Sequence, residues 1–417
     1  MPPHRRGDRR DGDRRRGADR PRHPSPPADR NRRPFPPVDR PRHPSPPSVR
    51  TTRVELTFLG GLGDVLADEV REVLEVEPRP APGREDALVV DLPGDRLGRV
   101  RRLRTAVAAF VVLHHDVPRP RALLSGEHLQ RIVDAAYASL RVAGSSTFRF
   151  EAAGADSAVF ARLADELARA TGLKHDPGEG ELVVKVRRGA PSSGDRRRSR
   201  SGGGPAERPG DDPGWDVLVR IGPRPLSART WRVADFPGAA NATIAAAMVR
   251  LAGVQPDDRV LNLMCGSGTL LVERLLAGPA AAAVGIDVAD DALTAARENL
   301  EAAGLTRRVA LAQADALAPS SWPADLLPGS SADVILADPP WGTLHGRHAD
   351  APAVHAGLLR AAHAVAAPGA RLVVLTHEVK VMAAAVRDAA DLWHAQPPVR
   401  VFAKGHHPRI HVLTRVP

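Results

Sequence analysis

A carboxylate, two prolines and a tryptophan stand together in Asp338-Pro339-Pro340-Trp341, directly after the apolar run Val334 to Ala337. The prolines fix φ and remove two backbone donors, so the chain must leave the predicted strand in a stiff, extended form. Asp338 and the Pro339 carbonyl can then accept hydrogen bonds from an exocyclic NH2 group whose ring stacks on Trp341. We therefore predict substrate-binding and catalytic roles for Asp338, Pro339 and Trp341, at the strand end where open α/β sheets place ligands.

A glycine turn lies upstream, in Asn262-Leu-Met-Cys-Gly-Ser-Gly-Thr269, between a predicted strand and a predicted helix. Gly266 and Gly268 allow a ligand to approach the backbone closely, and the helix begins with free N–H groups. The next strand, Ala283 to Asp287, ends in an acid about 20 residues after the glycines, where a nucleotide-type fold places its ribose-binding carboxylate. A third strand, residues 309–313, is followed by Asp315. Together these strand ends predict a nucleotide-like cofactor.

Residues 237–417 resemble a class I S-adenosylmethionine-dependent methyltransferase. The turn at Asn262–Thr269 is similar to that family's first motif, with Asn262 in place of the usual Asp, and the three later strand ends match the motifs that follow. The form Asp-Pro-Pro-aromatic-Gly resembles the THUMP-containing RNA methyltransferases that modify guanine N2 in tRNA, with Trp341 in place of the commoner Tyr. The resemblance implies a cofactor site formed by Asn262, Cys265, Gly266, Gly268, Asp287 and Asp315.

The expected enzyme transfers a methyl group from S-adenosyl-L-methionine to the exocyclic N2 of a guanosine in tRNA. A strand-end carboxylate can orient any exocyclic amine, so adenine-N6 methylation of RNA or DNA is an alternative, and protein amide methylation is another. A different class of protein is also possible, an RNA-binding THUMP protein with an inactive methyltransferase domain. The intact Gly266, Gly268, Asp287 and Asp338 argue against that alternative, whereas Asn262 leaves it open.

The composition changes along the chain and suggests its division. Residues 1–50 hold fifteen Arg against six Asp in a Pro-rich repeat that cannot form a core. This segment is either a flexible arm that attracts phosphate, a solvated tail without a role, or the product of a miscalled start. Residues 51–222 alternate strands and helices and resemble a ferredoxin-like part followed by a THUMP module, although an unrelated α+β domain is an alternative. Within this region we expect a disordered insertion at residues 189–213, and residues 223–236 form the expected linker.

The predicted fold is α/β. Its carboxyl-terminal part is a Rossmann-like sheet that ends in an antiparallel hairpin formed by residues 399–404 and 410–415, and an α+β region precedes it. Asn241 to Leu251 is expected to form a helix, and Asp290 is expected to cap the helix that runs from Asp291 to Ala303. A terminal hairpin on a mainly parallel sheet is typical of class I methyltransferases.

A single cysteine, Cys265, excludes an internal disulfide and a multi-cysteine metal site. Its place in the glycine turn predicts a small buried residue and not a nucleophile. No apolar run reaches the ~20 residues of a membrane span, and no signal peptide is evident, so we expect a cytoplasmic monomer without a metal. His345 and His348 line the pocket, bind phosphate or lie in a solvated loop, and His406 and His407 are expected in the hairpin turn.

Overall fold

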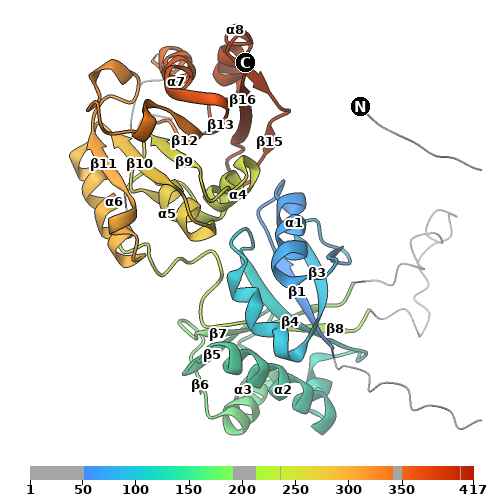
Figure 1. Cartoon of the computed structure of the whole chain (residues 1–417). Coiled ribbons are helices and arrows are strands. Elements are labelled where there is room, and N and C mark those ends of the chain that lie inside the picture. Colours follow the sequence, from blue (N-terminus) through green and yellow to red (C-terminus); the bar gives the residue numbers. More distant parts are fainter. Residues whose placement is uncertain (1–50, 191–212, 235, 341–349, 404) are drawn as a thin grey trace, which may run out of the picture. The chain divides into compact units, whose positions relative to one another are not determined.

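The computed structural model describes residues 51–190, 213–234, 236–340, 350–403 and 405–417, which build two eight-stranded sheets (Figure 1). The tail at residues 1–50, Trp341, His345 and His348 lie outside the described residues. No helix in the described part of the chain is long and apolar enough to cross a membrane.

The first sheet has the strand order β2-β3-β1-β4-β8-β7-β5-β6. Val54 and Leu56 point into its core, whereas Glu55 between them lies on the other face, as strand geometry requires. There the Glu55 carboxylate accepts hydrogen bonds from Arg187 at 2.6 and 3.1 Å. The strands are β1 (Thr51–Thr57), β2 (Arg79–Pro80), β3 (Ala87–Pro93), β4 (Ala108–His115), β5 (Thr147–Ala152), β6 (Lys174–His175), β7 (Leu182–Arg188) and β8 (Trp215–Arg220).

Helices cover one face of this sheet and bury their apolar sides in a shared core. They are α1 (Gly63–Leu74), α2 (Gly126–Val142), α3 (Ala158–Thr171) and the 3-10 segments η1 (Gly94–Arg102) and η2 (Pro120–Leu124). Helix α3 ends at its C-cap residue, Gly172. Gly172 has a φ of 76° and donates its N–H to the Ala168 carbonyl at 2.8 Å.

Strands β7 and β8 pair as antiparallel neighbours, from Val184 opposite Val219 to Arg188 opposite Trp215. Beyond them the Gly189 N–H donates to the Gly214 carbonyl at 3.0 Å. Residues 191–212, outside the described part, therefore connect two adjacent strands of one sheet. This is the position expected for the insertion, while the domain boundaries themselves stay a prediction.

The second sheet has the order β11-β10-β9-β12-β13-β16-β14, with β15 also paired to β16. Strands β9 to β13 are parallel, and β16 runs antiparallel to β13. The predicted α/β class with terminal antiparallel strands is thus confirmed. The strands are β9 (Arg259–Leu263), β10 (Ala282–Asp287), β11 (Ala310–Gln313), β12 (Ala332–Ala337), β13 (Ala366–Thr376), β14 (Trp393–Ala395), β15 (Val399–Arg400) and β16 (Arg409–Arg415).

Helices pack on both faces of this sheet (Figure 1). Val260 and Val334 contribute to the core under α4 (Ala242–Ala252), α5 (Thr269–Ala277) and α6 (Asp290–Ala302). Their neighbours Leu261 and Ile335 point to the opposite core, under α7 (Ala351–Val365) and α8 (Val379–Asp388). A sheet buried on both faces needs strands that are apolar on both sides, which explains the consecutive apolar residues Val260 and Leu261 in β9 and Val334 to Ala337 in β12.

Two local predictions differ from the structure. Asp290 is not the cap of α6: it is the first helical residue, and Ala289, whose side chain makes no capping hydrogen bond, occupies the N-cap. The Asp287 carboxylate instead accepts from the Ala289 N–H at 3.0 Å and sets where the helix begins. The expected strand 399–404 is shorter in the structure, where β15 ends at Arg400. The Val401 N–H still donates to the Pro408 carbonyl at 3.1 Å, but Pro408 has no N–H to donate in return, and only an isolated bridge between Ala403 and His406 follows.

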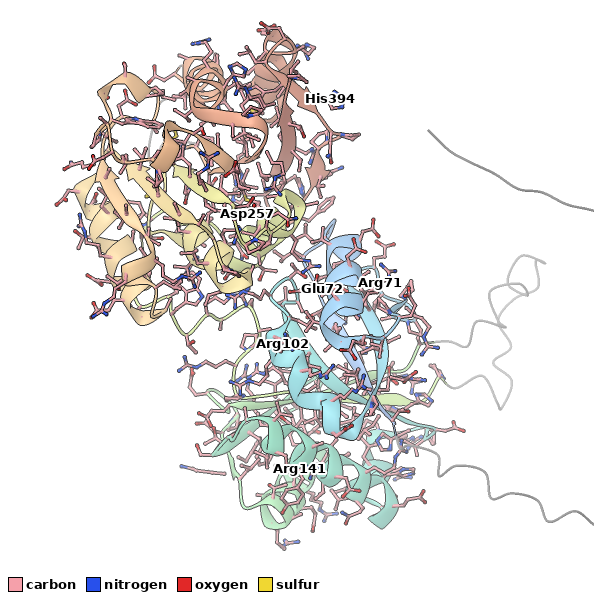
Figure 2. All side chains as sticks on the ribbon, in the orientation of Figure 1. Arg71, Glu72, Arg102, Arg141, Asp257 and His394 are labelled. Carbon is pink, nitrogen blue, oxygen red and sulfur yellow. The ribbon has the colours of Figure 1, made fainter. Side chains whose placement is uncertain are left out.

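Helix α1 contributes to two cores at once, and both sheets belong to one compact unit, residues 49–417. Leu66 and Val70 pack into the core of the first sheet, whereas Leu62 and Val65 join the core beneath α4. Glu72 of α1, labelled in Figure 2, accepts a hydrogen bond at 2.7 Å from the guanidinium of Arg250 in α4. The first half is thereby packed directly against the second.

A buried ionic cluster strengthens this packing. The Glu273 side chain on α5 is fully buried and accepts from Arg104 Nε at 2.6 Å and from Arg229 Nε at 2.8 Å. Arg229 also donates to the Arg104 carbonyl at 2.6 Å. The carboxylate thus holds the first half, the segment after β8 and α5 together.

Candidate active site

A tight turn between β9 and α5 forms one wall of a cavity. Met264, Gly266 and Gly268 have φ values of 54°, 52° and 76°. A non-glycine residue in this left-handed region costs about 1–3 kcal/mol, so the fold holds Met264 in an unfavourable conformation at this wall. At Gly268 a Cβ would also lie 3.2 Å from the Ala296 side chain. The turn places the start of α5, with its free N–H groups, beside the cavity.

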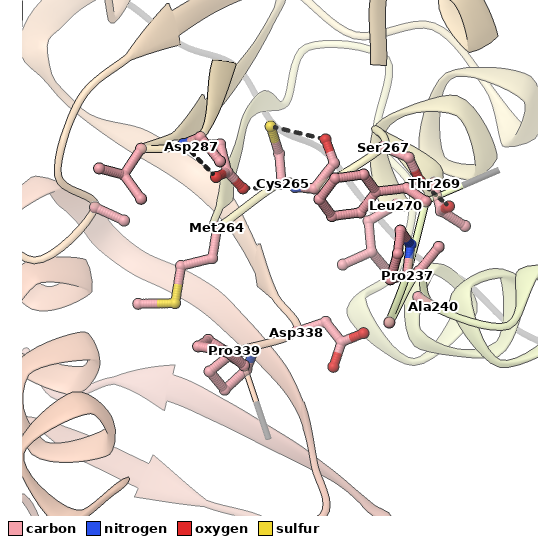
Figure 3. Close-up of a pocket in the computed structure, with 18 of the residues that line it drawn as sticks. Pro237, Ala240, Met264, Cys265, Ser267, Thr269, Leu270, Asp287, Asp338 and Pro339 are labelled. Atoms are coloured by element: carbon pink, nitrogen blue, oxygen red, sulfur yellow. Dashed lines mark hydrogen bonds between the residues drawn. The ribbon is translucent and has the colours of Figure 1, made fainter. Parts of the chain in front are cut away.

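Asp287 at the end of β10 fixes this turn. Its Oδ2 accepts from the Gly266 N–H at 2.8 Å, and its Oδ1 accepts from the Ala289 N–H at 3.0 Å. The same carboxylate lines the cavity, as Figure 3 shows. Asp287 therefore positions the backbone and also presents acceptor oxygens to a ligand.

The cavity has a volume of about 340 Å³, within the usual size of a small-molecule site. It spans the carboxyl ends of β9 to β12, where Asp315 follows β11 and Asp338 follows β12. Apolar side chains lie between these carboxylates. Its other lining residues are Phe236, Pro237, Gly238, Ala239, Ala240, Met264, Cys265, Gly266, Ser267, Thr269, Leu270, Asp287, Val288, Ala289, Ala316, Leu317, Pro339, Pro340 and Val354.

Asp338 is the most perturbed acid of this cavity. Its Oδ1 is buried and has no hydrogen-bond partner among the residues that the structure describes. Burial raises the pKa of the Asp338 carboxyl to about 7. A buried acceptor without a partner in a cavity indicates a place for a donor from a ligand, since such an oxygen is costly to leave unpaired.

Most of the residues predicted for the site lie together around this cavity. Cys265, Gly266, Asp287, Asp315, Asp338 and Pro339 line it. Cys265 is buried, and burial raises the pKa of its thiol far above the usual range, which agrees with a packing residue and not a nucleophile. Trp341 lies outside the described residues.

Asn262 and Gly268 are not part of the cavity wall. The buried Asn262 side-chain amide donates to the Leu336 carbonyl at 3.0 Å and to the Leu263 carbonyl at 3.2 Å. It thus ties β9, which carries the glycine turn, to β12, which carries Asp338.

The sequence analysis did not predict one wall of the cavity, which residues 236–240 form. Phe236 was assigned to the linker, yet residues 236–240 line the cavity opposite the strand ends. Asn299 holds the segment before them: its Oδ1 accepts from the Val233 and Ala234 N–H groups, and its amide donates to the Ser267 carbonyl at 3.0 Å. The available signal was the position of Phe236-Pro-Gly directly before the helix that Asn241 caps.

Comparisons with known proteins agree with this geometry. Residues 229–409 match the family model described as RMKL-like, methyltransferase domain. A tRNA (guanine(6)-N2)-methyltransferase of Thermus thermophilus is 30% identical over 367 residues, which cover 82% of this chain and 99% of that protein. The mouse U6 snRNA (guanine-N(2))-methyltransferase THUMPD2 is 39% identical over 120 residues, 28% of this chain and 21% of that protein.

Solved structures show the same fold across both halves. The crystal structure of TrmN from Thermus thermophilus aligns with a TM-score of 0.62 at 25% identity, and covers 88% of this chain and 100% of that one. SMU.472, solved in complex with SAH, aligns with a TM-score of 0.56 at 12% identity over 87% of this chain and 98% of that chain. The chain therefore belongs to the family of the tRNA guanine-N2 methyltransferases, with an RMKL-like class I methyltransferase domain in its carboxyl-terminal half.

Proposed function

We propose that this enzyme methylates the exocyclic N2 of a guanosine in tRNA, with S-adenosyl-L-methionine as the methyl donor. The observation that carries the proposal is the position of Asp338. Its Oδ1 is buried, has no hydrogen-bond partner in the part of the chain that the structure describes, and belongs to a residue that lines the same cavity as the glycine turn and Asp287. One cavity therefore offers acceptors for an amine at one end and a nucleotide-type binding turn at the other.

The residues of the cavity fit the methyl donor. Asp287 and Asp315 supply carboxylates at neighbouring strand ends, suited to ribose hydroxyls and amino groups, while Val288 and Leu317 offer apolar surface for a flat ring. Gly266 lets the ligand approach the backbone. Asn262 lies outside the cavity, so we assign it a positioning role through its bond to the Leu336 carbonyl. When bound, the donor supplies an electrophilic methyl group on a sulfonium.

Asp338 and the Pro339 carbonyl act on the acceptor amine. The lone pair of an exocyclic amine is delocalised into its ring, and hydrogen bonds from NH2 to these two acceptors turn the lone pair toward the methyl group. They also stabilise the positive charge that develops on nitrogen. Because the pKa of Asp338 is raised to about 7, its carboxylate can accept the proton that N2 releases as the N–CH3 bond forms and the S–CH3 bond breaks.

The first half is proposed to bind the tRNA, and position 6 is the proposed target. The support is the Thermus relative, named for guanine 6, which matches over 99% of its length and so includes the region before the methyltransferase domain. Extraction of the base from its stack has a free-energy cost that stacking on Trp341 would partly offset. The cytoplasmic location stays a prediction.

The test is methyl transfer to an unmodified tRNA transcript, followed by nucleoside mass spectrometry. We expect N2-methylguanosine from the wild type and far less from Asp338→Ala, whose affinity for S-adenosyl-L-methionine by calorimetry should change little. Trp341→Ala should weaken engagement of the base by roughly 1–3 kcal/mol, while Trp341→Tyr keeps much of the activity. Wild-type rates with Asp338→Ala would contradict the mechanism, and N6-methyladenosine as the product would transfer the substrate assignment to adenine.

A further inference from the structure

An aromatic and cationic cluster lies on the turn that leads from β15 to β16. The side chains of Arg400, Phe402 and His407 are all exposed, and 41% of Phe402 is accessible to solvent. The Arg400 guanidinium lies 4.5 Å from the centroid of the Phe402 ring, and the His407 ring meets it edge-on at 4.8 Å. Among the described residues, no carboxylate pairs with Arg400. The charge of Arg400 is therefore available to an anionic ligand.

The sheet register places this cluster at the same edge as Asp338. Strand β13 runs parallel to β12, with Ala337 opposite Val374, and ends two residues later at Thr376. Arg409 of β16 is opposite Thr376, and Arg400 of β15 is opposite Arg409. The cluster thus lies at the carboxyl edge of the parallel strands.

The strand order also fixes the side of Asp338 on which the cluster lies. The proposed methyl-donor site spans β11, β10 and β9, and β12 with Asp338 comes next, followed by β13, β16 and β15. Figure 1 shows β15 and β11 at opposite ends of this sheet. We expect the methyl acceptor to approach Asp338 from the side of β13, β16 and β15, which carries the cluster, because the proposed donor site takes up the other side.

The cluster is also joined to the first half of the chain. The Phe402 N–H donates to the Gly60 carbonyl at 2.9 Å, and a Cβ on Gly60 would lie 3.2 Å from Phe402 Cδ2. At Gly61 a Cβ would overlap the Arg400 carbonyl oxygen, so the loop after β1 fits closely only with glycine there. The cluster therefore contacts the first half of the chain through the loop after β1.

We propose that Arg400, Phe402 and His407 form a platform for the RNA strand beside the target nucleotide, which deepens and rests on the proposed function. Aromatic rings and guanidinium planes are the surfaces on which unstacked bases lie, and Arg also binds phosphate. The Arg400–Phe402 stack supplies both the flat surface and the charge. The ligand is thus a single-stranded RNA segment next to the methylated guanosine.

The test measures the affinity of an unmodified tRNA transcript by fluorescence anisotropy at several salt concentrations. Phe402→Leu keeps apolar bulk against Gly60 and removes the ring, and we expect binding to weaken about five- to tenfold, the lower range for one base–aromatic stack. Arg400→Ala should also reduce the salt dependence by about one phosphate contact. The matched control is Arg307→Ala, which removes an exposed charge beside the amino end of β11 and should leave binding unchanged.

Affinity for S-adenosyl-L-methionine, measured by calorimetry, reports whether each variant keeps its fold. Equal tRNA affinity of Phe402→Leu, Arg400→Ala and the wild type would overturn the platform, as would an equal loss in Arg307→Ala, which would indicate a general effect of charge. Failure of the proposed function is distinguishable, because it would appear in the wild type as the absence of N2-methylguanosine.

Discussion

The substitution Asp338→Asn tests the electrostatics of the site directly. Burial raises the pKa of this carboxyl from an ordinary value near 3.8 to about 7. At about 1.36 kcal/mol per pH unit this corresponds to about 4 kcal/mol, an upper limit because the protein relaxes around a buried charge. Because the pKa of Asp338 is higher in the folded state than in the unfolded state, its contribution to the free energy of unfolding is complete below about pH 4 and is lost as the pH rises to about 7. The asparagine variant has no such loss.

We therefore expect Asp338→Asn to gain stability over the wild type as the pH rises, by about 1–3 kcal/mol between pH 4.5 and 8. Urea unfolding at the two pH values measures this difference. The control is Asp325→Asn, at an exposed position, for which the difference should stay within about 0.5 kcal/mol. An equal response of the two variants would refute the claim that the fold buries an ionisable carboxyl here.

The same variants separate stability from catalysis. If the ionised carboxylate orients the amine, wild-type turnover should rise with pH through about 7 and level off above it. Asp338→Asn should be more stable at pH 8 but slower, because its amide presents one acceptor oxygen instead of two. A variant that is both more stable and equally fast, with the same pH profile, would show that the carboxylate is not needed.

Three further outcomes are expected. Asp287→Ala removes a carboxylate that accepts from the Gly266 and Ala289 N–H groups. The binding free energy of S-adenosyl-L-methionine, measured by calorimetry, should weaken by roughly 1.5–3 kcal/mol. Unchanged affinity would show that Asp287 is not part of the cofactor site. Glu273→Gln leaves the nearly buried Arg229 without its countercharge and should lower the free energy of unfolding, measured in urea, by about 3 kcal/mol. The control Glu301→Gln, at an exposed position, should lower it by less than about 0.5 kcal/mol, and equal effects of the two variants would contradict a stabilising role of Glu273. Removal of residues 1–50 should leave the melting temperature unchanged, and any loss of RNA affinity should fade at high salt. A large fall in melting temperature would show that this segment is part of the fold.

The sequence by itself determined the sheet of the second half and the order of its functional strand ends. Apolar runs, glycine turns and the Asp-Pro-Pro segment act over a few neighbouring residues, and their succession identifies the strands of a class I methyltransferase. Gly266, Asp287, Asp315, Asp338 and Pro339 line the cavity for this reason, because residues at or shortly after the end of a parallel strand lie at the common edge of the sheet. Cys265 follows too, as a small residue in the turn.

Only the tertiary structure decided the features that depend on distant partners. Asn262 bonds to the Leu336 carbonyl, 74 residues away, and so serves the sheet instead of the cavity wall. The Phe402 N–H bonds to the Gly60 carbonyl in the other half of the chain, and Arg104 meets Glu273 across 169 residues. Residues 236–240 form a wall of the cavity only because Asn299 holds the segment before them. Such contacts leave no local periodicity, because the two partners are chosen by the packing of the chain and not by their neighbours in sequence.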